Sequence, residues 1–332
     1  MRTTTMALLC SLAACAPMSD RENDWSGPDA GVDGSSASGA CDDLEIVNQA
    51  NLTISGSSGF TGLPTTCWKL NGKLTLTGPA ITSLEKLGDL RGVNDLEIND
   101  TDLTKFNTRS QIDVTGDIYI HHNDQLTEIA NVLPKGTVRS IRIESNAALT
   151  GLGNVSRATV VSGATTILSN AKLAAADLSS AQRLEGGLSI QDNGALTSIN
   201  LSALQSVGNL TIARNALLTT VGTMSSMTNV HGTFTIDSNN SLATLGTLGN
   251  AILVDVGISI TNNAKLSDVG ALAHASRVFG TVNISNNLQL DVTRAHEIGC
   301  CVQTGAFTAS NNRTNQCSGN HYCLNTQQNC FR

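Results

Sequence analysis

Apolar and polar residues alternate in a short phrase that recurs along most of the chain. In residues 208–215, GNLTIARN, Leu210 and Ile212 alternate with polar neighbours, so both side chains point to one face of a short strand. Asn215 follows three residues after Ile212, and its side chain can bond backbone groups where the strand turns. Leu218 and Val221 then supply apolar residues for the next side. One such unit cannot bury its own apolar face, whereas a stack of units can.

The spacing of this phrase, about 22 to 25 residues, predicts the fold class. We expect an all-β, right-handed parallel β-solenoid, or β-helix, of about twelve coils, where a coil is one turn of the chain. The predicted strand pairs are Leu52/Ile54, Leu74/Leu76, Leu96/Ile98, Ile118/Ile120, Ile141/Ile143, Thr165/Ile167, Leu188/Ile190, Leu210/Ile212, Phe234/Ile236, Ile258/Ile260, Val282/Ile284 and Phe307/Ala309.

An asparagine recurs at the turn after these strands. Aligned in space, these residues would form a ladder that bonds to adjacent coils, a structural role that we favour over ligand binding because the spacing places them inside. The predicted ladder is Asn123, Asn146, Asn170, Asn193, Asn215, Asn239, Asn263, Asn287 and Asn312.

The first 15 residues predict an export signal. Arg2 precedes an apolar run too short to span a bilayer as a helix, and Leu-Ala-Ala-Cys ends at Cys15. This ending resembles the lipobox of bacterial lipoproteins, whose cysteine is lipidated and becomes the new N-terminus. Ordinary cleavage after residue 16 is the alternative, but Pro17 directly after that cut disfavours it. We therefore expect a lipid-anchored, exported protein, and Ala16 rather than aspartate after the cysteine indicates the outer membrane or cell surface.

Composition indicates the bounds of the remaining segments and limits the classes of partner that the protein could bind. Residues 16–40 hold five acids against the single Arg21 and predict a flexible acidic linker. The repeats occupy residues 41–312, and residues 313–332 form a cysteine-rich C-terminal cap. Only 3% of the chain is aromatic, which fits a thin aliphatic core, and the net charge of −7 without a basic run disfavours nucleic acid as a partner.

The outward strand positions are mostly Thr, Ser and Asn, with one exception on three successive coils. We call these six residues the candidate surface: Glu97, Asn99, Tyr119, His121, Arg142 and Glu144. The period of two places them side by side and facing solvent. Cross-strand charge pairing on a solvated face is the simplest interpretation, and a recognition surface anchored by tyrosine and arginine is the second. His121 and His122 should split across the two strand faces, which weakens a two-histidine metal site.

The repeat phrase resembles the receptor L domain, the leucine-rich-repeat-like ligand-binding module of insulin and EGF receptors. The coil phrase at 204–212 and the N-terminal Cys41 and Cys67, just before residues 70–76, carry this resemblance. It implies a leucine-rich-repeat-like solenoid with a disulfide between Cys41 and Cys67 that closes the first coil. The following leucine stands three residues past Asn rather than two, and no kinase follows, so receptor signalling is not implied.

The remaining cysteines gather near the other end. In an exported protein they predict a disulfide-rich cap with one cysteine unpaired. A zinc site of Cys317, His321 and Cys323 is a less favoured alternative, because the spacing matches no strong metal pattern. The cysteines concerned are Cys300, Cys301, Cys317, Cys323 and Cys330.

These features predict a surface lipoprotein that recognises a protein or glycan, without enzymatic activity, cofactor or metal. A structural envelope protein without a specific ligand is the first alternative. A polysaccharide-active β-helix enzyme is less favoured, because the acidic residues are scattered rather than convergent.

Overall fold

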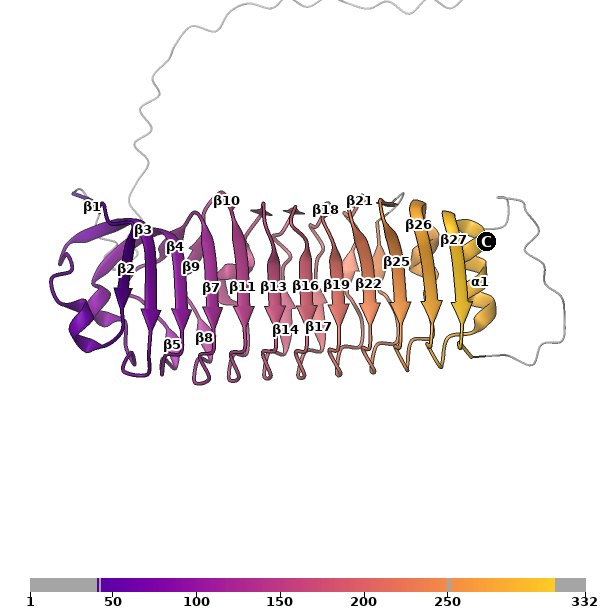
Figure 1. Ribbon diagram of the computed structural model, residues 1–332, viewed down its shortest axis with the longest axis horizontal. Coiled ribbons are helices and arrows are strands. Elements are labelled where there is room, and N and C mark those ends of the chain that lie inside the picture. Colours follow the sequence, from indigo (N-terminus) through magenta and orange to yellow (C-terminus); the bar gives the residue numbers. More distant parts are fainter. Residues whose placement is uncertain (1–40, 42, 250–251, 314–332) are drawn as a thin grey trace, which may run out of the picture. The chain divides into compact units, whose positions relative to one another are not determined.

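The computed structural model describes residues 41, 43–249 and 252–313. The compact unit discussed below begins at Cys41. The predicted signal peptide and linker, residues 1–40, lie outside the described residues, and so do residues 314–332 of the predicted C-terminal cap. The described unit is an all-β parallel solenoid, which confirms the predicted fold class (Figure 1).

Twelve strands stack in parallel along one side, and we call them the long-strand column. Their register aligns every predicted apolar pair, so that Leu188, Leu210 and Phe234 lie in one row. The interval is 22 residues from Leu52 to Leu74 and 25 from Val282 to Phe307. The strands are β2 (Asn51–Ile54), β3 (Cys67–Thr77), β4 (Asp89–Asn99), β7 (Asp117–His121), β11 (Ser140–Glu144), β13 (Thr165–Leu168), β16 (Leu188–Gln191), β19 (Leu210–Ala213), β22 (Thr233–Asp237), β25 (Gly257–Thr261), β26 (Ala275–Ser285) and β27 (Gln303–Ser310).

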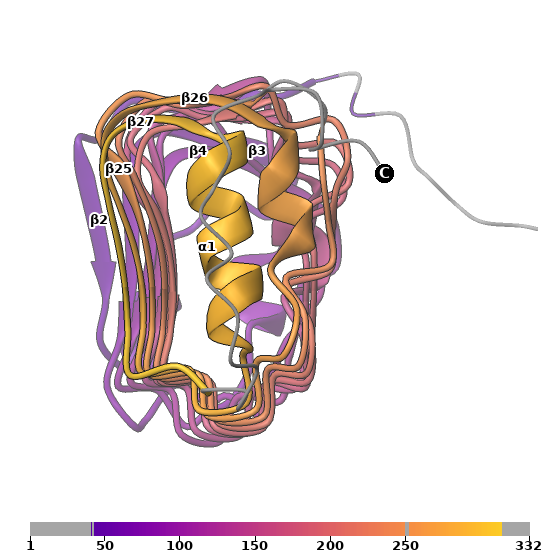
Figure 2. The same cartoon turned by 90° about the vertical axis from the view of Figure 1, so that its right-hand side faces the viewer.

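Shorter strands lie on two further sides of the solenoid. Seen from the C-terminal end in Figure 2, the chain runs down the long-strand column and returns on the opposite side as it approaches the viewer, which is a right-handed winding. The shorter strands on the side that precedes the long-strand column along the chain are β1 (Glu45–Val47), β6 (Ile112–Val114), β9 (Val132–Pro134), β10 (Thr137–Val138), β12 (Val160–Val161), β15 (Arg183–Leu184), β18 (Ser206–Val207), β21 (Asn229–Val230) and β24 (Ile252–Val254). Three small pairs are β5 (Lys105–Phe106) with β8 (Glu128–Ile129), β14 (Ala175–Asp177) with β17 (Ser198–Asn200), and β20 (Thr223–Met224) with β23 (Thr247–Leu248).

Aliphatic side chains from all sides fill a single narrow core. In one coil, Leu196, Ile199, Leu204 and Leu210 are all buried, because an apolar residue recurs about every three positions around the ring. Gly208 stands at the corner before β19, where a Cβ atom would lie 2.5 Å from the backbone oxygen of Glu185. A side chain there would push two coils apart, which explains the glycine of the repeated phrase.

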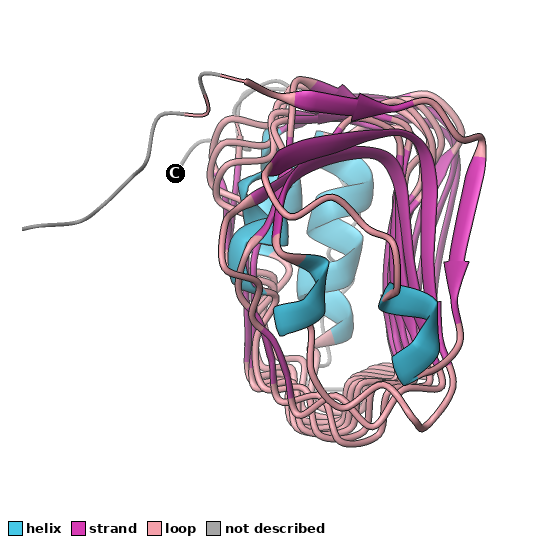
Figure 3. Cartoon of the chain, turned by 90° about the vertical axis from the view of Figure 1, so that its left-hand side faces the viewer, coloured by secondary structure: helices cyan, strands magenta, loops and turns pink. Residues whose placement is uncertain are grey.

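The turn after each long strand carries the asparagine ladder. Asn193 is fully buried, and its backbone N–H donates to Oδ1 of Asn215 at 3.1 Å, while its Nδ2 donates to the backbone oxygen of Ile167 at 3.0 Å. The same contacts recur from Asn123 to Asn312, with Thr101 in the equivalent place on the preceding coil. The turns superimpose in projection (Figure 3). Each asparagine therefore satisfies backbone groups of its neighbours that the turn leaves inside.

The residue directly before each ladder position has left-handed backbone geometry. These residues have φ between 53° and 59° although none is glycine. Those from Asp100 to Asn286 donate their backbone N–H to the following coil, as Ser169 does to Gln191 O at 3.0 Å. They are Asp100, His122, Ser145, Ser169, Asp192, Arg214, Ser238, Asn262, Asn286 and Asn311. The period of two thus ends at this residue in each of these ten coils, which the alternation of the sequence does not reveal.

Helical segments are short, and the longest one covers the C-terminal end of the core. Asp291 caps α1 (Val292–Cys301) by accepting a hydrogen bond from the backbone N–H of Thr293 at 2.8 Å. Ala295 and Ile298 are buried, and Figures 1 and 2 show α1 across the end of the stack. The other helical turns are η1 (Ser57–Phe60), η2 (Glu85–Leu87), η3 (Gly153–Arg157) and η4 (Gly270–His274).

Within the described residues, no helix combines the length and the apolar character needed to cross a membrane.

Candidate recognition surface

The six residues of the candidate surface lie side by side on β4, β7 and β11. The strand register places them in two rows across three coils, with β7 in the middle. The first row is Glu97, Tyr119 and Arg142, and the second is Asn99, His121 and Glu144. Sequence periodicity thus brings together residues separated by more than 40 positions.

These side chains point outward but lie against one another. Arg142 is exposed, whereas the other five are partly buried. The side chains of His121, Glu144 and Glu97 are 13%, 14% and 19% exposed. Asn99 accepts a hydrogen bond from the Thr77 hydroxyl at 2.5 Å. Mutual contact, rather than extension into solvent, sets the shape of this face.

Tyr119 is the centre of the candidate surface. Its ring stacks on His121 with centroids 3.8 Å apart, and the guanidinium carbon of Arg142 lies 5.3 Å from its centroid. The hydroxyl donates to Oε2 of Glu144 at 3.3 Å, and Arg142 Nε donates to Oε1 of the same carboxylate at 3.2 Å. Partial burial and the negative charge of Glu144 raise the pKa of Tyr119. The phenol therefore stays neutral at ordinary pH and is held by both neighbours.

Lys73 completes one edge of this face, and sequence reasoning missed it. Its Nζ lies 2.6 Å from Oε2 of Glu97, whose Oε1 lies 3.3 Å from His121 Nε2. Partial burial alone would raise the pKa of Glu97, but hydrogen bonds from Lys73 and His121 outweigh it and hold that pKa below its usual value. Lys73 pairs in register with Asp95 rather than Glu97, so only its long side chain brings it here.

A small hollow opens between these side chains. Its volume is about 190 Å³, below the usual size of a site for a drug-sized ligand. Arg139 links two carboxylates beside it, with an Nη2 atom 2.6 Å from Asp95 and 2.8 Å from Asp117. Burial raises the pKa of Asp117, but hydrogen bonds from Arg139 and Ser140 outweigh it and lower that pKa. The lining residues are Lys73, Asp95, Leu96, Glu97, Asp117, Tyr119, Ser140 and Arg142.

The expected separation of His121 and His122 across two strand faces is wrong. β7 ends at His121, and His122 has φ of 54°, so the alternation stops between them. His122 is exposed, and its Nδ1 lies 3.0 Å from Nδ1 of His121. Both rings therefore lie on the outer side of the solenoid.

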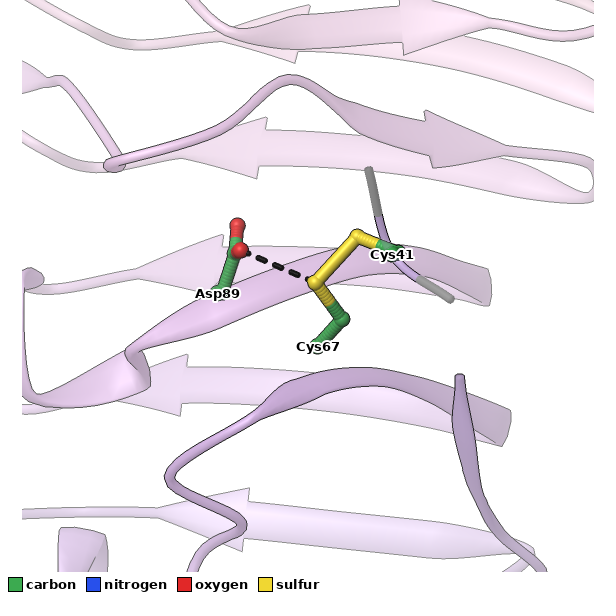
Figure 4. A group of neighbouring side chains, drawn as sticks. All are labelled: Cys41, Cys67 and Asp89. Carbon is green, nitrogen blue, oxygen red and sulfur yellow. Dashed lines mark hydrogen bonds between the residues drawn. A yellow bond between two sulfur atoms is a disulfide. The ribbon is translucent and has the colours of Figure 1, made fainter. Parts of the chain in front are cut away.

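A disulfide joins Cys41 and Cys67, as the resemblance implied. Figure 4 shows Asp89 beside it, with Oδ2 of Asp89 3.0 Å from Cys67 Sγ. These three residues form the one set of three potential metal donors that lie mutually within 4.8 Å among the described residues. A disulfide sulfur carries neither a proton to donate nor a thiolate charge, so the oxidised pair offers no zinc ligand.

The other predicted cysteines are described only in part. Cys300 and Cys301 lie at the end of α1. Cys317, Cys323 and Cys330 lie outside the described residues, as does the alternative zinc ligand His321.

Comparison of the chain with protein-family models, curated proteins and solved structures finds no match. The resemblance to the receptor L domain therefore stays a prediction from the repeat phrase.

Proposed function

We propose that the solenoid is a non-enzymatic recognition module that binds a protein or glycan through the candidate surface and the adjoining hollow. The observation that carries this proposal is the concentration of Tyr119, Arg142, Lys73 and paired carboxylates on four successive coils, at β3, β4, β7 and β11. Elsewhere in the same outward row stand Thr166, Ser189, Thr211, Thr235 and Ser259. Tyrosine and arginine are the side chains that most often dominate binding energy.

The local electrostatics support binding rather than proton transfer. The pKa values of Glu97 and Asp117 are lowered, so both stay ionised and serve only as hydrogen-bond acceptors at neutral pH. A general acid or base needs a pKa near the working pH. Donors from Lys73 and Arg142 together with these acceptors suit hydroxyl-rich or mixed-charge ligands.

We propose further that Cys15 is lipidated and anchors the exported protein at the outer membrane or cell surface, with residues 16–40 as a spacer. The Leu-Ala-Ala-Cys sequence supports this assignment. Cys15→Ser should move the chain from the membrane fraction to the soluble fraction. Membrane association that is unchanged in this variant would reject the lipid anchor.

The recognition proposal is tested with the full chain on a panel of glycans and cell-surface extracts. Tyr119→Ala combined with Arg142→Ala should abolish binding while circular dichroism and the melting temperature stay close to those of the wild type. Thr235→Ala combined with Ser259→Ala alters the same outward row on β22 and β25 and should bind normally. Binding that survives in the first double variant would reject the candidate surface.

A structural envelope protein is the second candidate, and the mutual pairing of the side chains favours it. Glu97, Glu144 and Asp117 all have cationic partners within the face. If pairing is their whole role, no ligand is found and both double variants behave alike in every binding assay.

A further inference from the structure

The end of β7 places two imidazoles in direct contact. Nδ1 of His121 lies 3.0 Å from Nδ1 of His122, and the ring planes meet at 74°. Two ring nitrogens this close would repel each other if each directed a lone pair at the other, so a cation must lie between them. They share either a proton or a metal.

Glu97 fixes which nitrogen of His121 faces its neighbour. Oε1 of Glu97 lies 3.3 Å from Nε2 of His121, and Oε2 is ion-paired with Lys73 at 2.6 Å. A carboxylate only accepts hydrogen bonds, so Nε2 of the neutral ring carries the proton. The lone pair of Nδ1 then points to His122. Histidines that bind metals are usually oriented in this way, by a carboxylate on the nitrogen opposite the metal.

The two rings differ in mobility and access. Tyr119 stacks on His121 at 3.8 Å and leaves its side chain 13% exposed, so the ring is held in place. His122 is exposed, and its backbone N–H is bonded to Glu144 O at 3.1 Å. One potential ligand is thus fixed, and the second is reached from solvent.

We propose that His121 and His122 bind one divalent late transition-metal ion, Ni²⁺ or Cu²⁺, through their Nδ1 atoms, with Glu97 as the orienting carboxylate. Two nitrogens each about 2.0–2.1 Å from an ion lie about 2.9 Å apart at a 90° angle and about 3.4 Å apart at the tetrahedral angle. The separation of 3.0 Å is near the first value. That geometry is typical of tetragonal Ni²⁺ and Cu²⁺ sites, and imidazole is a preferred ligand of both.

Both imidazoles stay neutral when the ion binds. His121 keeps its proton on Nε2, against Glu97, and His122 moves its proton from Nδ1 to Nε2. Among the residues that the structure describes, no third His, Cys, Asp or Glu forms a set with this pair within 4.8 Å. Water or a donor from another molecule completes the coordination, so the site is open.

The test uses Ni²⁺ alone, which thiols do not reduce, titrated calorimetrically into the full chain. The site needs no recognition ligand, so this result is independent of the proposed function. His121→Gln and His122→Asn should each remove one equivalent of bound Ni²⁺ or weaken its binding at least tenfold. Asparagine tolerates the left-handed backbone of residue 122, so the second variant keeps the turn. Glu97→Gln should weaken binding about 10-fold to 100-fold.

The matched control is His231→Gln. His231 pairs with Asp255 at 3.2 Å on a distant coil, and this variant should bind Ni²⁺ as the wild type does. Wild-type binding in either His121→Gln or His122→Asn would overturn the proposal, as would loss of binding in His231→Gln alone. Circular dichroism of each variant shows that the solenoid persists.

Discussion

The backbone N–H of Asn193 donates to the side-chain Oδ1 of Asn215 at 3.1 Å, one coil further along the chain. Asn215 repeats this contact with Asn239 at 3.0 Å. Because both groups are buried, the side chain of each coil satisfies the backbone of the coil before it. Cohesion between coils thus depends on this ladder as well as on the apolar core.

Asn193→Ala tests the ladder. Removing the amide strands the buried N–H of Asn170 and the backbone oxygen of Ile167, so the free energy of unfolding should fall by about 1–3 kcal/mol. Asn240→Ala, at an exposed position whose side chain makes no hydrogen bond among the described residues, should change it by less than about 0.5 kcal/mol. Chemical denaturation of both variants measures the difference, and equal losses would show that the ladder contributes nothing beyond a surface asparagine.

Ser169 is one of the residues with left-handed backbone that precede the ladder positions, and the protein's stability should respond unusually to its substitution. Its φ of 57° suits glycine and disfavours β-branched residues, so Ser169→Val should destabilise the protein by about 1–2 kcal/mol. Ser169→Gly should stay within about 1 kcal/mol of the wild type. Ser189→Val places the same residue on extended backbone in β16 and serves as the control. Melting temperatures of the three variants should separate Ser169→Val from the other two.

Thr165 offers a stabilising substitution. It occupies the apolar row between Ile141 and Leu188, is buried, and its hydroxyl has no hydrogen-bond partner among the described residues. Thr165→Val keeps the shape and removes the unpaired hydroxyl, so stability should rise by about 1 kcal/mol or more. Thr166→Val, at the adjacent outward position, is the control. A denaturation midpoint that falls in Thr165→Val would mean that the hydroxyl is satisfied.

The carboxylate of Asp237 should account for part of the loss of folding stability at acid pH. Burial on its own raises the pKa of Asp237, but hydrogen bonds from Thr261 and Asn262 outweigh it and leave the pKa lowered. The charged carboxylate therefore contributes stability that is fully present above the pKa of an unfolded aspartate, about 3.9, and is lost as pH falls through the lower folded value.

Asp237→Asn should accordingly lose less stability than the wild type when the pH falls from 6 to 3. Melting curves at intervals across this range measure the effect. An identical decline in both proteins would show that the carboxylate has the same proton affinity in the folded and unfolded chain.

The periodicity of the sequence predicts the rows of the solenoid because each apolar pair faces one core. Leu210 and Ile212 could be placed beside Leu188 and Ile190 from spacing alone, and the structure confirms that register. Alternation on the strand likewise places Glu97 beside Tyr119, since outward positions of adjacent parallel strands are neighbours.

The rest depends on features that a simple period does not encode. His122 lies one residue past the strand, where the left-handed backbone redirects its side chain. Lys73 reaches Glu97 diagonally through a long, flexible side chain. α1 is signalled by Asp291 and by apolar residues three apart at Val292, Ala295 and Ile298, a helical spacing within an interval that otherwise resembles one more coil.

The repeated hydrogen bonds of the left-handed residues before the ladder positions also affect how such a protein can change in length. The coils from Asp100 to Asn286 present the same backbone donor to the coil ahead and the same acceptor to the coil behind, so their two faces are complementary copies. Removing or duplicating one whole period, for example residues 171–193, would rejoin surfaces that already fit. The molecule is in this sense modular, and its length can be adjusted by whole coils without redesigning the core.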